Sequence, residues 1–585
     1  MRSEAAQPIS TTGIERWLPV VALARRYQAR WLVRDVVAGV ILTAMLVPVG
    51  MGYAQASGLP AIQGLYATIV PLLAYAVFGP SRVMVLGPDS SLCALIAAAI
   101  VPLAANDPSR ATALAGALSI LAGGLCLLAG LARAGFVADL FSKPIRFGFL
   151  NGIAVSVLIG QLPKLTGATS SGDNVPQQAI AFARAAAHGG VHAPTLAIGA
   201  SCLALILAMR RWTPRIPGVL VAVVGATVVV AVLDLAASAG VSAIGELPHG
   251  LPDFEIPRAS PSEWGALWSA ALAIALVSFA DTSVLSRTLA KRDDRAVDGN
   301  QELVALGAAN IAGGLFQGFP ISSSSSRTPV AVSVGAQSQL ACVVGALCIA
   351  ALLMFAPALL TNLPNAALAA IVIASCLSLF EIDGVARLYR LRRGEFALSL
   401  ICTAGVIVLG NLQGIFIAVG IALLAFVWRA WHPYDAVLGR VDGLKGYHDI
   451  ARHPDARRIP GLVLFRWDAP LFFANAEIFH EHVRRAIDDA PTPTKWVVVA
   501  AEPVTDIDTT AADMLVTLDR ELHARGMDLC FAEMKGPVKD HLRRYGLFTH
   551  LGEENFFRTV GQAVDRYVEL HKVEWVDWDE SPAAR

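Results

Sequence analysis

Long apolar segments, each close to the length that crosses a lipid bilayer, follow one another from Asp35 to about Trp431. Charged residues stand almost only in the breaks between these segments, as they do when helices are embedded in hydrocarbon. The whole chain is 55% hydrophobic and 16% charged, whereas soluble proteins carry about 25% charged residues. The sequence therefore predicts a polytopic α-helical membrane domain of about fourteen helices.

A second kind of sequence begins after His432, where charged residues become frequent. Short apolar runs such as GLVLF (Gly461–Phe465) and WVVVA (Trp496–Ala500) alternate with amphipathic helical patterns, which is typical of a soluble α/β domain. We expect four parts in order: an N-terminal segment at 1–34, the membrane domain at 35–432, the soluble domain at 440–575 and a tail at 576–585.

The breaks between segments differ in basic charge, and this difference predicts orientation. Alternate breaks hold only scattered charges, at Arg110, Lys164, Arg184 and Arg258. With an even number of spans, the N-terminus and the soluble domain then both lie in the cytoplasm, and a bacterial-type inner membrane is expected. The basic breaks carry Arg82, Arg133, Lys143, Arg146, Arg210, Arg211, Arg215, Arg287, Lys291, Arg292, Arg295, Arg387, Arg390, Arg392, Arg393 and Arg429.

Several function classes lack support in the sequence. The formal net charge is zero, so the sequence lacks the excess of basic residues that is typical of nucleic-acid-binding proteins. The phosphate-binding pattern GxxxxGK[ST] is missing, so ATP hydrolysis does not drive the protein. None of the eight cysteines forms a CxxC pair, and most lie in apolar runs as small hydrophobes. We expect no enzyme activity, no metal and no cofactor beyond a coupling ion.

An internal repeat divides the membrane part. GPSRVMVLGPDSSLCALIAAA (Gly79–Ala99) and GLFQGFPISSSSSRTPVAVSVGA (Gly314–Ala336) both pass from a short stretch through proline and serines into a helix, 235 residues apart. The repeats run approximately over 35–235 and 266–432. Seven spans per repeat is an odd number, so the second copy is inverted. Inverted repeats with helices broken at the midplane are typical of secondary transporters.

Each broken stretch starts a half-helix inside the membrane, and inversion makes the two starts face each other. Helix starts present unpaired N–H groups and a positive dipole end, which favours an anion. Ser322–Ser326 and Arg327 stand at the second start. An arginine at this depth normally faces a cavity or a partner. Two other interpretations of the serine run are a flexible linker and a polar stretch that packs between helices. The alternative for Arg327 is a purely structural pair with an acidic residue.

Two acids are candidates for carrying a coupling proton. Asp281 lies within the first span of the second repeat, where an ionisable residue is a functional-site hypothesis by default. Asp89 lies at the first half-helix start, and a plain capping role also explains it. Asp281 has the further alternative of a structural partner for Arg327.

The chain resembles the SulP anion transporters, the sulfate-permease family, over nearly its whole length. The similarity is carried by VPVGMGYAQASGLPAIQGLYATIVP (Val47–Pro71), GFVADLFSKPIRFGFLNGIAV (Gly135–Val155) and DGNQELVALGAANIAGGLFQGFPISSSSSRT (Asp298–Thr328). The resemblance implies seven plus seven inverted helices, a core domain that moves against a gate domain, a homodimer, and an anion site between the third and tenth helices, which begin around Gly87 and Ser326.

Family members commonly read Gly-Ser-Phe-Ser-Arg-Thr before the tenth helix, and here serine replaces both the glycine and the phenylalanine. Asp281 stands where many members carry glutamate. The substrate-binding residues implied by the repeat and the resemblance are Ser323, Ser324, Ser325, Ser326, Arg327, Thr328, Gly87, Pro88, Ser90, Gln55 and Tyr53.

The soluble part resembles a STAS domain through LFFANAEIF (Leu471–Phe479) and TDIDTTAADML (Thr505–Leu515). Thr509 lies where bacterial relatives of this domain are phosphorylated, which makes it a regulatory candidate. Thr510-Ala-Ala-Asp513 also matches a capping box, so helix capping by the Thr509–Thr510 pair is the alternative.

The function expected from the sequence is secondary active transport of a small anion, first of all sulfate, by symport with protons. The polar pocket also suits bicarbonate or a C4-dicarboxylate, and sodium is the other coupling ion considered. A nucleobase carrier of the same fold is disfavoured by Arg327. A membrane sensor that binds the anion without moving it, and signals through the STAS domain, is the alternative from another class.

Overall fold

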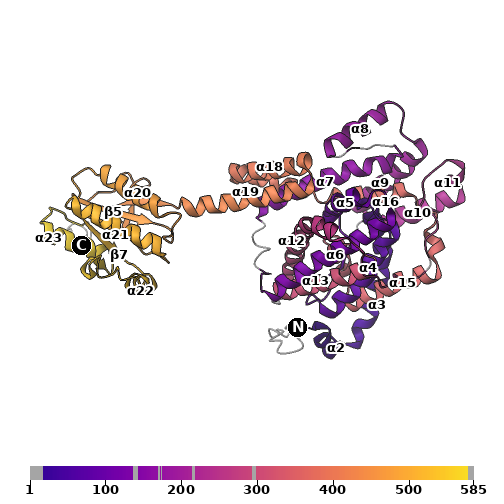
Figure 1. Ribbon diagram of the computed structural model, residues 1–585, viewed down its shortest axis with the longest axis horizontal. Helices are drawn as coiled ribbons and strands as arrows, with labels where there is room; N and C mark the ends of the chain where they lie inside the picture. Colours follow the sequence, from indigo (N-terminus) through magenta and orange to yellow (C-terminus); the bar gives the residue numbers. More distant parts are fainter. Residues whose placement is uncertain are drawn as a thin grey trace. The chain divides into compact units, whose positions relative to one another are not determined.

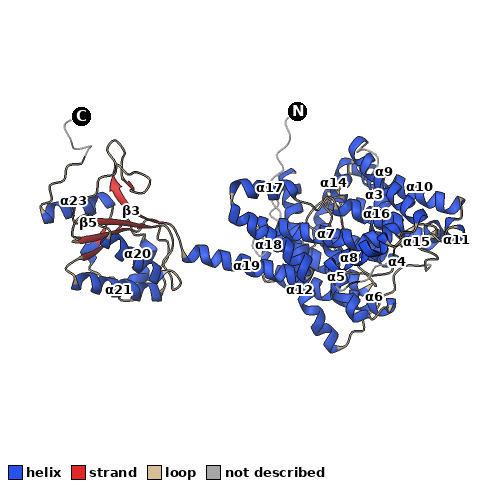
Figure 2. Ribbon diagram, turned by 90° about the horizontal axis from the view of Figure 1, so that it is seen from above, coloured by secondary structure: helices blue, strands red, loops and turns tan. Residues whose placement is uncertain are grey.

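A computed structural model describes residues 18–135, 142–168, 172, 174–213, 218–248, 250–292 and 298–577. The chain forms two compact units, one from Met1 to Ala422 and one from Leu423 to Arg585 (Figure 1). The first unit is helical and the second contains a mixed sheet with helices on both faces (Figure 2).

The helices of the first unit enclose one large apolar core built mainly from alanine, leucine, isoleucine and valine. Six helices in the described residues are long and apolar enough to cross a membrane: α3, α4, α6, α7, α9 and most of α12. The described helices are α2 (Pro19–Arg26), α3 (Ala29–Ala56), α4 (Ala61–Phe78), α5 (Ser90–Ala104), α6 (Pro108–Leu131), α7 (Lys143–Thr166), α8 (Val175–Ala187), α9 (Ala193–Trp212), α10 (Gly218–Val232), α11 (Leu235–Ser238), α12 (Pro261–Arg292), α13 (Gly299–Leu315), α14 (Arg327–Ser333), α15 (Leu340–Phe355), α16 (Asn365–Cys376), α17 (Ile382–Leu391), α18 (Arg393–Leu409) and α19 (Asn411–Trp431).

Helices α6 and α13 pack closely because glycines from the two helices face each other. A Cβ atom added to Gly123 would lie 2.7 Å from the carbonyl oxygen of Gly307, and one added to Gly116 would lie 2.8 Å from that of Gly314. From Gly123 to Gly116 the chain of α6 steps back by seven residues, while the contacted residue of α13 steps forward by seven, from Gly307 to Gly314. The two helices therefore run antiparallel. Small residues let membrane helices approach to backbone contact in this way.

The two repeated stretches meet as predicted, through a short pair of strands within the helical unit. Strand β1 (Leu86–Gly87) pairs antiparallel with β2 (Ser322–Ser323), with Leu86 opposite Ser323 and Gly87 opposite Ser322. All four residues are buried. Helix α5 follows β1 after two residues, and α14 follows β2 after three.

The second unit is built on a six-stranded sheet in the order β4-β3-β5-β6-β7-β8. Strand β3 is antiparallel to β4 and β5, and the pairs from β5 to β8 are parallel. The central strand WVVVA is buried along its whole length, as expected for a parallel strand covered on both faces. The strands are β3 (Asp435–Arg440), β4 (Tyr447–Asp449), β5 (Leu462–Trp467), β6 (Trp496–Ala500), β7 (Asp528–Ala532) and β8 (Phe556–Phe557).

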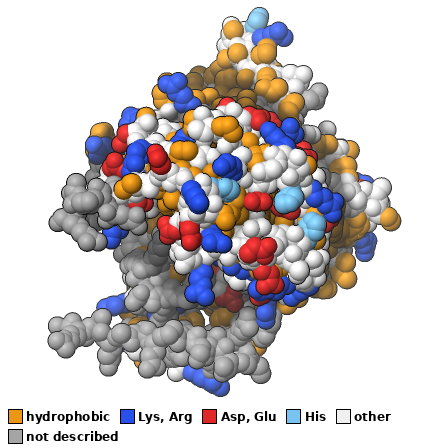
Figure 3. Space-filling model, turned by 90° about the vertical axis from the view of Figure 1, so that its left-hand side faces the viewer, with side chains coloured by type: hydrophobic (Ala, Val, Ile, Leu, Met, Phe, Trp, Pro, Cys, Tyr) orange, Lys and Arg blue, Asp and Glu red, His pale blue; other side chains and the backbone are white. Residues whose placement is uncertain are grey.

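Helices close this sheet on both sides and produce two apolar cores. The larger core packs α20 (Ala476–Asp488), α21 (Thr509–Ala524) and α22 (Gly536–Arg544) against one face, and α23 (Val560–His571) covers the other. Basic and acidic side chains are interspersed on the face seen in Figure 3. Pairs such as Arg485–Glu481 at 2.8 Å lie along helices at the spacing of one turn.

Candidate functional site

The first helix start at the strand pair is well capped. Asp89 is the N-cap residue of α5, and its side chain accepts a hydrogen bond from the Ser91 N–H at 3.0 Å. The capping interpretation of Asp89 is therefore confirmed. Ser90, the first residue of the helix, is buried directly beside this cap.

The second helix start is shorter than the half-helix that the repeat predicts. Helix α14 has only seven residues, and its N-cap residue Ser326 makes no capping hydrogen bond. Pro329 lies in its first turn, and the chain leaves the helix near Val334. A single short helix contributes little dipole, so the positive charge at this end comes mainly from Arg327.

Arg327 is the most unusual side chain of the site, because it is only 1% exposed. Its Nε donates to Ser324 Oγ at 2.8 Å, and its Nη2 donates to the carbonyl oxygen of Pro88. Its Nη1 is buried without a hydrogen-bond partner. Within the described residues, no carboxylate forms an ion pair with this guanidinium, so an Arg327–Asp281 pair is not formed.

The serine run is part of the site and is not a linker. Ser322 and Ser323 form β2, and the Ser324 N–H donates to the Val85 carbonyl at 2.9 Å. The Thr328 hydroxyl accepts a hydrogen bond from the Val85 N–H at 3.0 Å. These bonds hold the two stretches of the repeat together. Ser324 and Thr328, which were predicted to bind substrate, therefore have a structural role.

The hydroxyls left for a ligand are fewer than the run suggests. Ser323 Oγ is buried without a partner, whereas Ser324 Oγ is engaged by Arg327. Ser325 and Ser326 are exposed beside the arginine in sequence. The structure thus brings Ser323, Arg327 and Gly87 together, with unused donors on the first two.

Gly87 lies directly against the arginine. Its φ of +150° is in the region that favours glycine. A Cβ atom here would be 3.1 Å from Nη1 of Arg327 and 3.6 Å from Nη2. The absence of a side chain at this position therefore leaves the unpaired nitrogen uncovered.

The two predicted acids are linked by one hydroxyl, that of Ser91. Ser91 Oγ lies 2.9 Å from Asp89 Oδ1 and 3.1 Å from Asp281 Oδ2. Ser91 is fully buried. The sequence analysis placed Ser90 in the site and missed Ser91, although its position two residues after the N-cap Asp89 could have indicated it.

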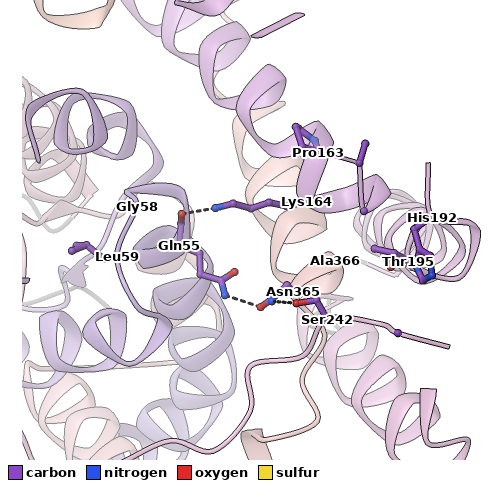
Figure 4. Close-up of a pocket in the computed structure, with 13 residues that line it drawn as sticks. Gln55, Gly58, Leu59, Pro163, Lys164, His192, Thr195, Ser242, Asn365 and Ala366 are labelled. Atoms are coloured by element: carbon purple, nitrogen blue, oxygen red, sulfur yellow. Dashed lines mark hydrogen bonds between the residues drawn. The ribbon is translucent and has the colours of Figure 1, made fainter. Parts of the chain in front are cut away.

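The two predicted residues of α3 lie in different places. Tyr53 is 2% exposed and lies within electrostatic range of both Asp89 and Arg327. The Gln55 side chain instead donates to Asn365 Oδ1 at 2.7 Å, at the wall of a separate cavity (Figure 4). The structure does not bring Gln55 to the unpaired nitrogen of Arg327 by any described hydrogen bond.

A third buried carboxylate, Glu302 in α13, was missed by the sequence analysis. It is fully buried, and its two oxygens accept hydrogen bonds from Ser81 at 2.5 Å and from Tyr75 at 2.8 Å. These bonds join α13 to α4 and to the segment before β1. Its position, an acidic residue in the first turn of a mainly apolar helix, could have indicated a buried carboxylate.

The regulatory candidate Thr509 is exposed at the first position of α21. The capping box read from Thr510 and Asp513 is wrong, because Asp508 is the N-cap and accepts a hydrogen bond from the Ala511 N–H at 2.8 Å. Thr509 therefore has no capping role, and its regulation stays a prediction.

The helical fold and the buried cationic site define an integral membrane transporter of anions with a C-terminal STAS domain. The sulfate permease family matches residues 32–402, and the STAS domain family matches residues 453–563. The chain belongs to the sulfate permease family. The predicted family and fold class are confirmed, and the family is one of transporters rather than enzymes.

Individual relatives agree with this assignment. A probable sulfate transporter of Mycobacterium tuberculosis is 41% identical over 551 residues, which cover 94% of this chain and 98% of the relative. The chloroplastic sulfate transporter 4.1 of Arabidopsis thaliana is 29% identical over 584 residues, covering 96% and 84%. The solved structure of the murine solute carrier 26 family member A9 anion transporter, in the inward-facing state, is similar in fold with a TM-score of 0.88, 21% identity, and coverage of 97% and 96%.

Proposed function

We propose that the chain is a proton-coupled secondary active transporter of sulfate. The observation that carries this proposal is the buried Nη1 of Arg327, which has no partner and faces Gly87. A buried guanidinium N–H without a hydrogen-bond partner is costly, and a bound anion removes that cost. The hydroxyl of Ser323, which is also buried without a partner, supplies a further donor for an oxyanion.

Sulfate is preferred over other anions because similar proteins of Mycobacterium tuberculosis and Arabidopsis thaliana are named as a probable sulfate transporter and a sulfate transporter. Bicarbonate and C4-dicarboxylates are the competing substrates, since both also present oxygens to an arginine. A fold neighbour at a TM-score of 0.59 is the transmembrane domain of a cyanobacterial bicarbonate transporter. That likeness concerns the fold alone and does not favour bicarbonate.

Proton coupling is supported by counting hydrogens around Ser91. A hydroxyl has one hydrogen, yet Ser91 Oγ is within hydrogen-bond distance of both Asp89 and Asp281. Asp89 Oδ1 also accepts the Ser91 N–H, so Asp89 is already engaged at the helix start. The single Ser91 hydrogen cannot serve both carboxylates fully, and uptake of a proton by Asp281 relieves this competition, which makes Asp281 the proposed carrier of the coupling proton.

The charges around Asp281 fit a group that binds and releases a proton. Asp89 and Arg146 are charged neighbours within electrostatic range of Asp281. Asp89 is in turn within electrostatic range of Arg327 and Tyr53. Loss of the proton leaves two carboxylates to share one hydroxyl, which weakens the link between α12 and the start of α5.

The arrangement in the cell is proposed from charge distribution and from the family. The basic breaks support a bacterial-type inner membrane location in which the N-terminus and the STAS domain lie on the cytoplasmic side. The transport cycle is a movement of the core helices, with the bound anion, relative to the gate helices, and the protein works as a homodimer.

Uptake of radioactive sulfate into proteoliposomes tests the function. Wild-type protein should accumulate sulfate under an inward proton gradient, with bicarbonate, succinate and uracil as competitors. Arg327→Gln should weaken sulfate binding at least about 30-fold, because it removes a buried charged partner. Arg258→Gln, an exposed arginine, is the matched control. Binding without uptake would identify a sensor and reject transport.

A further inference from the structure

A cavity lined by both polar and apolar residues lies between the ends of α3 and α7 and the starts of α9 and α16 (Figure 4). Its volume is about 650 Å³, many times the roughly 30 Å³ of a water molecule. None of the described residues that line it is acidic. The cavity does not include Gly87, Ser323 or Arg327.

Lys164 supplies the positive charge of this cavity. Its side chain extends from α7 across to α3, where Nζ donates to the Gln55 carbonyl oxygen at 2.6 Å (Figure 4). An ammonium group has three hydrogens, so this bond leaves two for another acceptor. Among the described residues, no carboxylate forms an ion pair with it.

Neutral donors line the same cavity in a chain of hydrogen bonds. Gln55 Nε2 donates to Asn365 Oδ1 at 2.7 Å, and Asn365 Nδ2 donates to Ser242 Oγ at 2.7 Å. Each amide nitrogen has a second hydrogen, and the Ser242 hydroxyl keeps its own hydrogen because here it acts as acceptor. Three donors and one cation thus line this cavity, and no described residue of its lining is anionic.

We propose that this cavity is a second anion-binding site, selective for a small oxyanion of the sulfate class. The Lys164 ammonium contributes the charge, and the amide of Asn365 with the hydroxyl of Ser242 contributes oriented hydrogen bonds. The site goes beyond the proposed function, because an anion can bind at Lys164 whether or not the protein transports it.

Equilibrium binding of radioactive sulfate to the full-length protein in detergent tests this site. Wild-type protein should bind a second sulfate per chain beyond the one that depends on Arg327. Lys164→Gln should weaken that second binding by about 10- to 100-fold, which is the worth of a charge-assisted hydrogen bond. Lys164→Arg should retain it. Lys143→Gln, at the other end of the same helix, is the matched control and should change nothing.

Further variants separate the two sites and the two proposals. Ser242→Ala should weaken only the Lys164-dependent binding, and Arg327→Gln only the other. Lys164-dependent binding in a protein that shows no uptake would support this site and reject the transport proposal. Equal sulfate binding by wild-type protein and Lys164→Gln would overturn the site, leaving Lys164 as a structural tie between α7 and α3. Absence of any bound sulfate would overturn it as well.

Discussion

At the scale of single residues, the site depends on a buried guanidinium that forms no ion pair with a carboxylate of the described residues. Arg327 is 1% exposed and has one nitrogen without a partner. Burying an unpaired ion costs several kcal/mol even after relaxation. The Pro88 carbonyl and the Ser324 hydroxyl offset part of that cost through dipoles. The remainder is available to bind an anion, which explains why the sign of the ligand is fixed here.

Gly87→Ala should weaken sulfate binding by about 10-fold or more. The new Cβ would lie 3.1 Å from Nη1 of Arg327, so it would crowd the nitrogen that we propose binds the anion. The substitution also adds backbone strain at φ +150°. Gly189→Ala, at φ +78° with open space around it, controls for strain alone. The dissociation constant for sulfate measures the effect, and equal losses in both variants would contradict the steric argument.

Ser91→Ala should move the pH at half-maximal uptake upward by about 0.5–1 unit. In the wild type the Ser91 hydroxyl donates to the Asp281 carboxylate and stabilises its ionised form, so its removal makes proton loading easier and allows it at a higher pH. Ser91→Thr should restore the profile, and Thr282→Val, which removes a buried hydroxyl next to Asp281, should leave it unchanged.

The direction of this shift decides between two arrangements of the hydroxyl. A downward shift in Ser91→Ala would mean that Ser91 instead accepts a hydrogen bond from a protonated Asp281, contrary to the direction of the hydrogen bond in the structure. Asp281→Asn should remove the dependence of uptake on a proton gradient. Uptake that stays proton-dependent in this variant would place coupling elsewhere.

The position of the site could be predicted from the sequence, whereas the hydrogen bonds within it could not. Arg327 and the serine run stood out because charge and polarity are rare between apolar segments, and the repeat placed Gly87 opposite them. The sequence could not predict which serine or threonine hydroxyl lacks a hydrogen-bond partner, because this depends on the hydrogen bonds of Val85 with Ser324 and Thr328. The Ser91 bridge needs the position of α12, which no local pattern encodes.

At the scale of elements, the strand pair is held in place by the helices that pack around it. Helices α6 and α13 make backbone contact at two glycine pairs, Gly123 with Gly307 and Gly116 with Gly314. Glu302 then ties α13 to α4 through Tyr75 and to the segment before β1 through Ser81. The position of β1 therefore depends on helix contacts and hydrogen bonds that lie outside the site itself.

Gly123→Ala should destabilise the membrane unit by about 1–3 kcal/mol, the usual cost of overpacking. Its Cβ would meet the Gly307 carbonyl oxygen at 2.7 Å and the Ile311 nitrogen at 2.8 Å, and backbone atoms cannot rotate away. The neighbouring Gly124 has nothing within 4 Å of its Cβ position, so Gly124→Ala should be neutral or stabilising. Thermal unfolding in detergent compares the two, and equal melting temperatures would contradict the close packing.

Helices were easier to predict than their ends. The apolar segments predicted α3 and α6, because hydrophobic length alone indicates a membrane helix. The seven residues of α14 fall short of the expected half-helix, since Gly335 adopts φ +92° and turns the chain before α15. The capping box at Thr510 failed for a similar reason: Asp508 two residues earlier is the better cap.

At the scale of the whole molecule, the chain has separate apolar cores in its two units. The change in composition after His432 marks this difference in the sequence, because a membrane helix and a soluble sheet need different surfaces. The matched STAS family at 453–563 agrees with strands read from GLVLF and WVVVA. Strand order was not predictable, since β3 precedes β4 but lies between β4 and β5.

Stability of the second unit should depend on pH through Asp449. Burial alone raises the pKa of Asp449, but hydrogen bonds from Tyr434 and from the Ala451 N–H, with the charges of Arg452 and Arg466, outweigh it and lower the pKa. A lowered pKa in the folded state means that this stabilisation is complete above the ordinary aspartate value of about 3.9. It is lost as the pH falls below that value through the folded-state pKa.

Tyr434→Phe should therefore destabilise the second unit by about 1 kcal/mol at pH 7, because it removes a hydrogen bond to a carboxylate. The difference from the wild type should shrink below about pH 4 as Asp449 takes up a proton. Hydrogen exchange of the β3 and β5 amides in the full-length protein measures this unit separately. In an Asp449→Asn background, Tyr434→Phe should have a smaller effect, since the charged acceptor is absent. A loss of stability that is the same at pH 7 and pH 3.5 would show that the tyrosine acts through packing and not through this carboxylate.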